Sequence, residues 1–194
     1  PYAIDTDVNA AAMAEGKWGN AEALRSWAYV TVGTGIGVGS IVEGQPVRGL
    51  GHSEAGHLLV PRLAHDDFAG NCPFHGDCVE GLASGPAIAA RTGQPAHALS
   101  GNDPVWTSVS AALAALCHNL ILTSLPERIL FGGGIAIGQR HLLPAIRARL
   151  VSNLAGYGPA ATLMDCIDDY IAYPKLGDQA GPLGSIVLAQ LAAS

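Results

Sequence analysis

Two cysteines and two histidines lie close together in the middle of the chain, in the pattern His57…Cys72-Pro-Phe-His75-Gly-Asp-Cys78. They belong to segment 49–82, whose many Gly, Pro and His residues predict an irregular loop. A loop of that length inside a compact domain needs something to hold it. Two thiolates and two imidazoles are donors that tetrahedral zinc prefers. The pattern therefore predicts a structural zinc, ligated by protein alone, that ties down the 49–82 loop.

Another interpretation of this cluster is that Cys72 and Cys78 are free thiols or a disulfide, with both histidines on the surface. No secretory signal is visible, and without one this spacing favours a metal over a disulfide. We therefore expect the cytoplasm as the compartment. The other two cysteines, Cys117 and Cys166, stand singly in apolar surroundings and are predicted to be packing residues.

The formal net charge of −6 argues against nucleic acid as a partner, because binding to phosphates needs clustered Lys and Arg. Arg140, Arg147 and Arg149 form the closest basic group, and a solvated helical face explains them. No apolar run reaches the ~18 residues that span a bilayer. We therefore expect no membrane segment. The hydrophobic fraction, 49% of the 194 residues, is enough for the buried core of a globular domain.

Hydrophobic periodicity predicts strands that alternate with long helices, which is typical of an α/β fold. Strands are predicted at 27–32, 38–43, 128–131 and 170–173, with the first two paired as a hairpin and the last at a sheet edge. Helices are predicted at 8–19, 84–91, 104–123, 139–152 and 181–192. No repeat, linker or domain boundary is visible, so residues 1–194 are expected to form a single α/β domain.

Two glycine-rich stretches could let a ligand approach the backbone. The run Gly33–Gly39 has glycine at every second position, which suits either a tight turn or the binding of an anion by backbone N–H groups. It matches neither the Walker motif nor the dinucleotide fingerprint. Gly132-Gly133-Gly134 follows a predicted buried strand, where it is either a strand-to-helix joint or a place for a nucleotide.

Several carboxylates and histidines are further candidates for chemistry. Asp7 lies at the start of a predicted helix, where aspartate is usually a cap but could also act as a general base toward a sugar hydroxyl. His52, Glu54, His57 and Glu80 could form several hydrogen bonds with a polyol, or they could be scattered surface residues.

Together and in this order, these motifs resemble the ROK family, and within it the bacterial fructokinases, over nearly all of the chain. The resemblance lies in Asp5-Thr6-Asp7-Val8-Asn9, Thr31–Gly37, Gly49–His57, Cys72–Gly81 and Ile129–Gly134. It implies that Asp7 is the catalytic base and that Asn9, His52, Glu54 and Glu80 contact the sugar. It further implies phosphate binding by Gly33, Thr34, Gly35 and Gly37, adenosine binding by Gly132, Gly133 and Gly134, and zinc binding by His57, Cys72, His75 and Cys78.

The resemblance also implies a fold and a reaction. The fold would be the actin-like, ribonuclease-H-like ATPase domain, as the C-terminal part of a two-lobed sugar kinase. The reaction would phosphorylate D-fructose to fructose 6-phosphate with ATP and Mg²⁺, in a homodimer. The family's N-terminal strand and Gly-rich ATP-phosphate loop do not precede Asp5. We therefore expect the chain to be a portion of a longer kinase, with little or no activity alone.

Three other functions fit the same motifs. The domain could be the sugar-sensing part of a ROK-type transcriptional repressor, although Asp7 and the His-containing metal loop favour a kinase. It could also be a scaffold that keeps its metal but binds no sugar. The third possibility is a kinase for glucose, mannose or an N-acetylated amino sugar, because hexoses differ in few hydroxyl positions.

Overall fold

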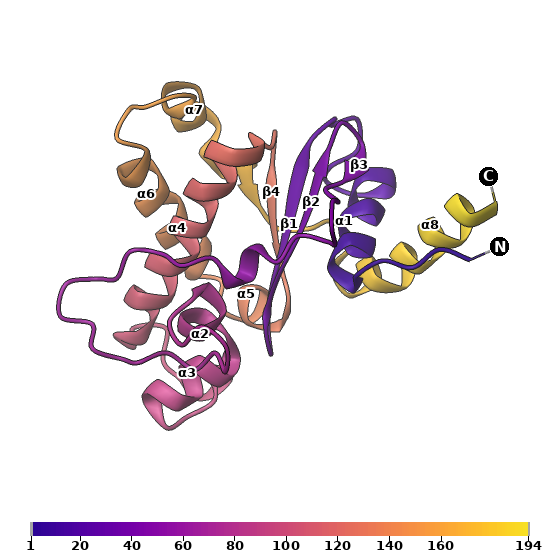
Figure 1. Ribbon diagram of the computed structural model, residues 1–194. Helices are drawn as coiled ribbons and strands as arrows, with labels where there is room; N and C mark the ends of the chain where they lie inside the picture. Colours follow the sequence, from indigo (N-terminus) through magenta and orange to yellow (C-terminus); the bar gives the residue numbers. More distant parts are fainter. Residues whose placement is uncertain (1, 194) are drawn as a thin grey trace.

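The computed structural model describes residues 2–193, which form a mixed sheet of five strands in the order β3-β2-β1-β4-β5, with helices on both faces (Figure 1). β1 (Trp27–Val32) and β2 (Ile36–Val42) form an antiparallel hairpin, and β3 (Gln45–Pro46) pairs antiparallel with β2. β4 (Ile129–Gly132) and β5 (Ile171–Ala172) run parallel to β1. The predicted α/β class and the predicted hairpin are therefore confirmed.

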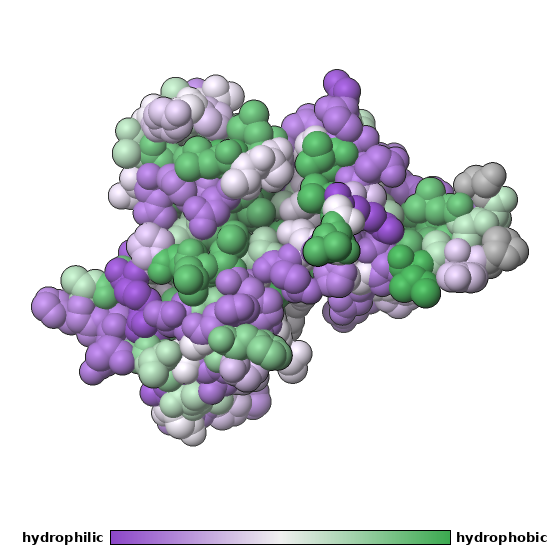
Figure 2. Space-filling model, viewed as in Figure 1, coloured by the Kyte–Doolittle hydropathy of each residue, from purple (hydrophilic) through white to green (hydrophobic). Residues whose placement is uncertain are grey.

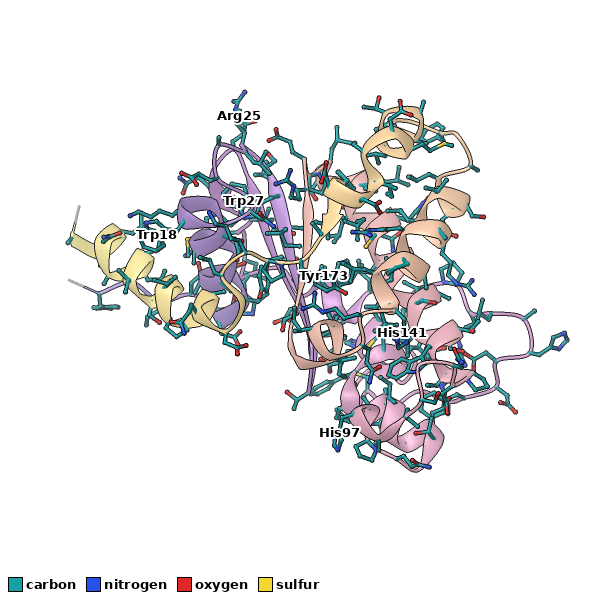
Figure 3. All side chains as sticks on the ribbon, turned by 180° about the vertical axis from the view of Figure 1, so that it is seen from behind. Trp18, Arg25, Trp27, His97, His141 and Tyr173 are labelled. Carbon is teal, nitrogen blue, oxygen red and sulfur yellow. The ribbon has the colours of Figure 1, made fainter. Side chains whose placement is uncertain are left out.

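Both faces of the sheet are buried. The side chains of β1 alternate between the two faces and so belong to two different cores. Ala28, Val30 and Val32 join a large core with α4 (Val105–Ser124) and α6 (Leu142–Leu154). Trp27 and Tyr29 join a smaller core on the opposite face, with α1 (Asp7–Trp18) and α8 (Ala180–Ala193). Figure 3 shows Trp18 and Trp27 on this second side of the sheet.

Shorter helices complete the layers: α2 (Val79–Ala83), α3 (Gly85–Thr92), α5 (Gly134–Gly138) and α7 (Ala160–Tyr170), with 3-10 turns η1 (Ala55–His57), η2 (Ala96–Ala98) and η3 (Gly177–Gln179). Ser84 caps α3 by accepting the N–H of Ala87, and Gly19 follows the end of α1. α2, α5 and α7 were not predicted. The expectation of an irregular 49–82 segment is wrong at both η1 and the start of α2.

The longest helix, α4, is long and apolar enough to cross a bilayer, which the sequence pattern did not lead us to expect. The structure explains its composition differently, since 61% of its most apolar window is buried. It packs on α6, α2 and α3. α4 thus has the burial of a core helix.

Two predictions about single residues need correction. Cys117 is buried as expected, but Cys166 is exposed at a kink in α7, so it is not a packing residue. Arg147 is not solvated either: its guanidinium donates to the backbone carbonyl of Ile171 and pairs with Asp168 at 2.8 Å. This arginine therefore fastens the end of α7 to α6 rather than lining a free helical face.

A buried carboxylate joins distant parts of the chain. Glu15 in α1 is fully buried, and its oxygens accept the backbone N–H groups of Asn20, Lys175 and Leu176 at 2.7–3.1 Å. A buried charge is tolerated when it is hydrogen-bonded in this way. The contact positions the segment before α8 against the end of α1. α8 is mostly apolar and leaves Ile186 48% exposed. Figure 2 shows hydrophobic surface in the region of α8, at the right of the view.

Candidate functional site

The four residues of the predicted metal cluster come together in the structure. The ligand atoms of His57, Cys72, His75 and Cys78 all lie within 4.8 Å of one another. His57 is at the end of η1, and Cys78 is the residue before α2. The Val79 N–H donates to the Leu58 carbonyl at 3.0 Å, which joins these two elements. The cluster is therefore assembled by backbone pairing as well as by its side chains.

The distances between these donors fit a metal. Nδ1 of His57 lies 3.6 Å from Sγ of Cys72 and 3.5 Å from Sγ of Cys78, and Nδ1 of His75 lies 3.7 Å from Sγ of Cys72. Tetrahedral zinc with bonds of about 2.3 Å to sulfur and about 2.0 Å to nitrogen separates the two donors by about 3.5 Å. Two sulfurs and two imidazole nitrogens at this spacing fit zinc.

The pKa values of the two thiols are shifted in opposite directions. Burial raises the pKa of Cys72, but the backbone N–H groups of His75 and Phe74 donate to its sulfur and lower the pKa to about 6. Burial, together with the neighbouring Cys72, raises the pKa of Cys78. A thiolate is the form that binds metals. Cys72 therefore presents a thiolate near neutral pH.

Glu80 connects the cluster with the glycine-rich hairpin. One carboxylate oxygen lies 3.9 Å from Nε2 of His57, on the side of the ring away from the sulfurs. The other oxygen accepts the backbone N–H of Ile36 at 3.0 Å. A Cβ added at Gly35 would lie 2.7 Å from this oxygen, so any side chain there would displace the carboxylate. Glycine at position 35 thus makes room for Glu80.

Ionic contacts hold the rest of the loop, and sequence reasoning missed them. Arg62 donates to Asp77 at 2.9 Å and to the carbonyls of Asp66 and Phe68. Arg91 in α3 donates to both oxygens of Asp66 at 2.8 and 3.1 Å. Asp66 is only 9% exposed. The loop is therefore tied down by this network in addition to the Cys and His cluster.

The Asp66 carboxylate should stabilise the fold in a pH-dependent way. Burial raises the pKa of Asp66, but hydrogen bonds from Arg91 and Phe68 outweigh it and lower the pKa from 3.8 to about 2. A depressed pKa contributes stability above the unfolded-state value, and this is lost as the pH falls from about 4 through about 2. We expect Asp66→Asn to lower the free energy of unfolding by about 2 kcal/mol near neutral pH.

Urea unfolding across this pH range would measure the effect. The difference between the wild type and Asp66→Asn should shrink as the pH drops. Asp67→Asn is the matched control, because Asp67 is exposed and has no ion pair within the described residues. A difference that stays constant from neutral pH to pH 2 would contradict the assignment.

The two glycine-rich stretches meet at the ends of their strands. Gly133 has a φ of +86°, and a Cβ there would lie 2.5 Å from the carbonyl oxygen of Val32. A cavity of about 380 Å³ is lined by Gly33 and Gly134, together with His97, which Figure 3 labels. The hairpin and the Gly132–Gly134 turn thus border one opening.

A second cavity, of about 250 Å³, lies on the other side of Gly134 and is walled by Tyr29 and Asp178. Burial and the charges of Glu15 and Asp178 raise the pKa of Tyr29 to about 12, so its hydroxyl is neutral. Sequence reasoning identified neither wall. Tyr29 appeared in it only as a strand former.

The start of α1 lies beside the hairpin. A Cβ at Gly39 would meet the carbonyl oxygen of Val8 at 2.6 Å, so glycine permits the close contact of α1 with β2. Asp7 is exposed, and its Oδ1 accepts the N–H of Val8 at 2.8 Å. Thr6 rather than Asp7 caps the helix, since its hydroxyl accepts the N–H of Asn9. Asp7 is therefore not used as the cap.

A cavity of about 360 Å³ lies between this helix start and the loop at 48–52, and it is lined by Asp5, Thr6, Arg48 and His52 among others. Asp5 is an unpredicted residue here: it pairs with Arg48 and accepts the side-chain amide of Asn9 at 2.8 Å. Asn9 itself is 2% exposed. His52 Nε2 lies 2.7 Å from Glu54, whose carboxylate is 66% exposed.

The structure thus groups the predicted site residues into three neighbouring clusters. Glu80 links the Cys and His cluster to the hairpin, the hairpin borders the Gly132–Gly134 turn, and His52 brings Glu54 to the cavity beside α1. The Asp7 side chain has no hydrogen bond or ion pair with the other predicted residues in the part of the chain that the structure describes. The open arrangement leaves its carboxylate accessible.

The profile of one protein family, the ROK family, matches residues 1–192. The chain is 41% identical to the fructokinase of Pediococcus pentosaceus over 192 residues and 42% identical to that of Zymomonas mobilis over 195 residues. These matches cover 99% and 97% of this chain but 65% and 62% of the two relatives.

Solved structures agree on the fold. The ROK hexokinase of Thermus thermophilus superposes with a TM-score of 0.77 at 25% identity, covering 97% of this chain and 65% of that one. The ROK family glucokinase of Streptomyces griseus, solved with glucose and AMPPNP, gives 0.72 at 24% identity, covering 96% and 68%. These sugar kinases have the actin-like ATPase fold, so the predicted fold class is confirmed.

Proposed function

Because the chain belongs to the ROK family, we propose that it forms the metal-tied part of an ATP-dependent hexose kinase whose sugar is D-fructose. The reaction would transfer the γ-phosphoryl group of ATP to a fructose hydroxyl, giving ADP and fructose 6-phosphate. One observation carries the proposal. Glu80, the proposed sugar ligand beside the metal cluster, also contacts the glycine-rich hairpin, in a chain 41–42% identical to two fructokinases.

Asp7 is the proposed general base. Its Oδ1 is fixed by the Val8 N–H, which leaves Oδ2 free to accept the proton of the attacking hydroxyl. Its place at the exposed start of α1, beside β2, would let a sugar approach it from the solvent side. Proton removal makes the sugar oxygen a better nucleophile as it attacks the γ-phosphorus.

Glu54, Glu80 and His52 are proposed to hold the sugar hydroxyls. The 2.7 Å contact between His52 and Glu54 would orient the glutamate, and the Ile36 N–H would orient Glu80. Asn9, whose amide is engaged by Asp5, would act by shaping the start of α1. Charged acceptors of this kind give strong hydrogen bonds to hydroxyl groups.

The nucleotide is proposed to lie along the two cavities beside Gly134. The hairpin residues Gly33 to Gly37 would face the phosphates, and Gly132 to Gly134 would face the adenosine next to Tyr29. Magnesium would enter with the nucleotide as part of the substrate, bound mainly by phosphate oxygens.

The Cys and His cluster would supply rigidity rather than catalysis. Bound zinc would hold η1 against α2 and so fix the spacing between Glu54 and Glu80. Reduced thiols and the use of ATP favour the cytoplasm for such an enzyme. Dimerisation is proposed on the family resemblance alone.

Calorimetric titration of the zinc-loaded chain with D-fructose, with and without ATP and Mg²⁺, tests the sugar site. We expect fructose to bind more tightly than glucose. Glu54→Gln and Glu80→Gln should each weaken fructose binding about tenfold or more, because each removes a charged hydrogen-bond acceptor.

Glu22→Gln is the matched control, because Glu22 is exposed and lies outside the proposed site. It should bind fructose like the wild type. Tighter binding of glucose, mannose or an N-acetylated hexose would assign a different sugar to the same kinase. If a folded, zinc-loaded chain binds no sugar with ATP and Mg²⁺ present, the proposed sugar site in this chain is wrong.

A further inference from the structure

A cavity of about 370 Å³ lies between α4, α6 and the loop residues Pro61, Arg62 and Leu63. In Figure 1 the segment after η1 passes in front of α4, and the cavity lies where this segment meets the two helices. None of its lining residues belongs to the proposed sugar or nucleotide site. Its volume is within the range of small-molecule sites.

The polar lining of this cavity is basic or neutral. It consists of Arg62, His118, Asn119, Arg149 and Asn153, and no lining residue is acidic. Arg149 is partly buried and has no ion pair or hydrogen bond within residues 2–193. A guanidinium held beside a cavity without a carboxylate partner attracts an anion.

Two more nitrogens of the lining lack partners. Nδ1 of His118 and Nε of Arg62 are buried from solvent, and neither has a hydrogen-bond partner in the described part of the chain. The terminal nitrogens of Arg62 are engaged by Asp77 and by two backbone carbonyls, which holds its guanidinium in one place. Buried nitrogens without partners are rare and call for a ligand or ordered water.

We propose that this cavity binds a small phosphate group, either inorganic phosphate or the phosphate of a phosphorylated metabolite. Arg149 supplies a forked pair of donors for its oxygens, as arginines do in phosphate sites. His118 and the amides of Asn119 and Asn153 supply further hydrogen bonds. Because Arg62 also holds Asp66 and Asp77, an occupant would stiffen the loop that carries Cys72 and Cys78.

NMR titration of the zinc-loaded chain with inorganic phosphate tests this proposal, with the imidazole protons as reporters. His118 lines this cavity, whereas His97 lines the cavity beside Gly33, where the nucleotide phosphates are proposed to lie. Saturable shifts of His118 at lower phosphate concentration than those of His97 are expected. Glucose 6-phosphate and neutral glucose, run in parallel, distinguish a phosphorylated metabolite from free phosphate and from a sugar.

Arg149→Gln should weaken phosphate binding at His118 about tenfold, since it removes a charged hydrogen-bond donor. Arg149→Lys should retain part of the affinity, and Arg25→Gln, on an arginine 77% exposed that does not line the cavity, should retain all of it. If His118 does not respond while His97 does, or if Arg149→Gln binds like the wild type in a folded chain, the proposal is overturned. Neither outcome bears on the proposed kinase site, which His97 reports independently.

Discussion

Asp7→Asn should lower the rate of fructose phosphorylation by about 10²- to 10⁴-fold, which is the usual contribution of a general base. The amide keeps the size of the side chain and can still accept the Val8 N–H, so α1 should begin as before. It cannot take the proton of the attacking hydroxyl. We therefore expect the loss in kcat, with KM for fructose nearly unchanged.

This experiment needs an active enzyme. The chain spans 65% of the Pediococcus pentosaceus fructokinase. We expect a hybrid that joins the unmatched part of that relative to this chain to provide one, and fructose-dependent ADP formation measures its turnover. Asp169→Asn, on an exposed carboxylate of α7, is the matched control and should leave turnover unchanged. Turnover by Asp7→Asn within tenfold of the wild type would remove Asp7 from the mechanism.

Loss of one proposed metal ligand should have the other large effect. Cys78 is fully buried and precedes α2 directly, so Cys78→Ala removes a proposed ligand at the point where the loop joins a helix. We expect the chain to lose its stoichiometric zinc, its melting temperature to fall by about 10 °C, and fructose binding to weaken at least tenfold. Binding weakens because the metal then no longer holds η1 against α2, so the spacing between the proposed sugar ligands Glu54 and Glu80 is no longer fixed.

Zinc per chain, thermal unfolding and hydrogen exchange of residues 58–78 measure these three effects. Exchange should accelerate in this loop while α4, in the large core, stays protected. Chelation of zinc from the wild type should reproduce the result. Cys166→Ala is the control, because Cys166 is exposed and distant in sequence from the cluster. An unchanged fructose affinity in the metal-free chain would show that zinc does not organise the site.

Local patterns predicted the parts of the fold that depend on nearby residues. Short runs of aromatic, β-branched and other apolar residues predicted β1 and β4, and the helix formers that follow Ser84 predicted α3. α2 has only five residues, one of them Gly81, which is unfavourable in a helix. Its helical form depends on packing against α4, which no local pattern contains.

In the candidate site, too, a local sequence pattern predicted some features and not others. The Cys and His spacing predicted that His57, Cys72, His75 and Cys78 lie together, because three of the four form a compact sequence motif. The contact of Glu80 with Ile36 joins residues 44 positions apart, and Arg91 reaches Asp66 across 25 positions. Such long-range pairs depend on how the loop folds over the sheet. A single sequence carries no signal for them.

The buried Glu15 has a consequence for the order of folding. Two of its partners, Lys175 and Leu176, come 160 and 161 positions later in the chain. During synthesis, therefore, Glu15 gains its last hydrogen-bond partners only when almost the whole domain has been made. Only then can α8 cover the apolar face of α1. The large core around α4 can assemble earlier. The face of the sheet that α1 and α8 cover is thus completed after the large core.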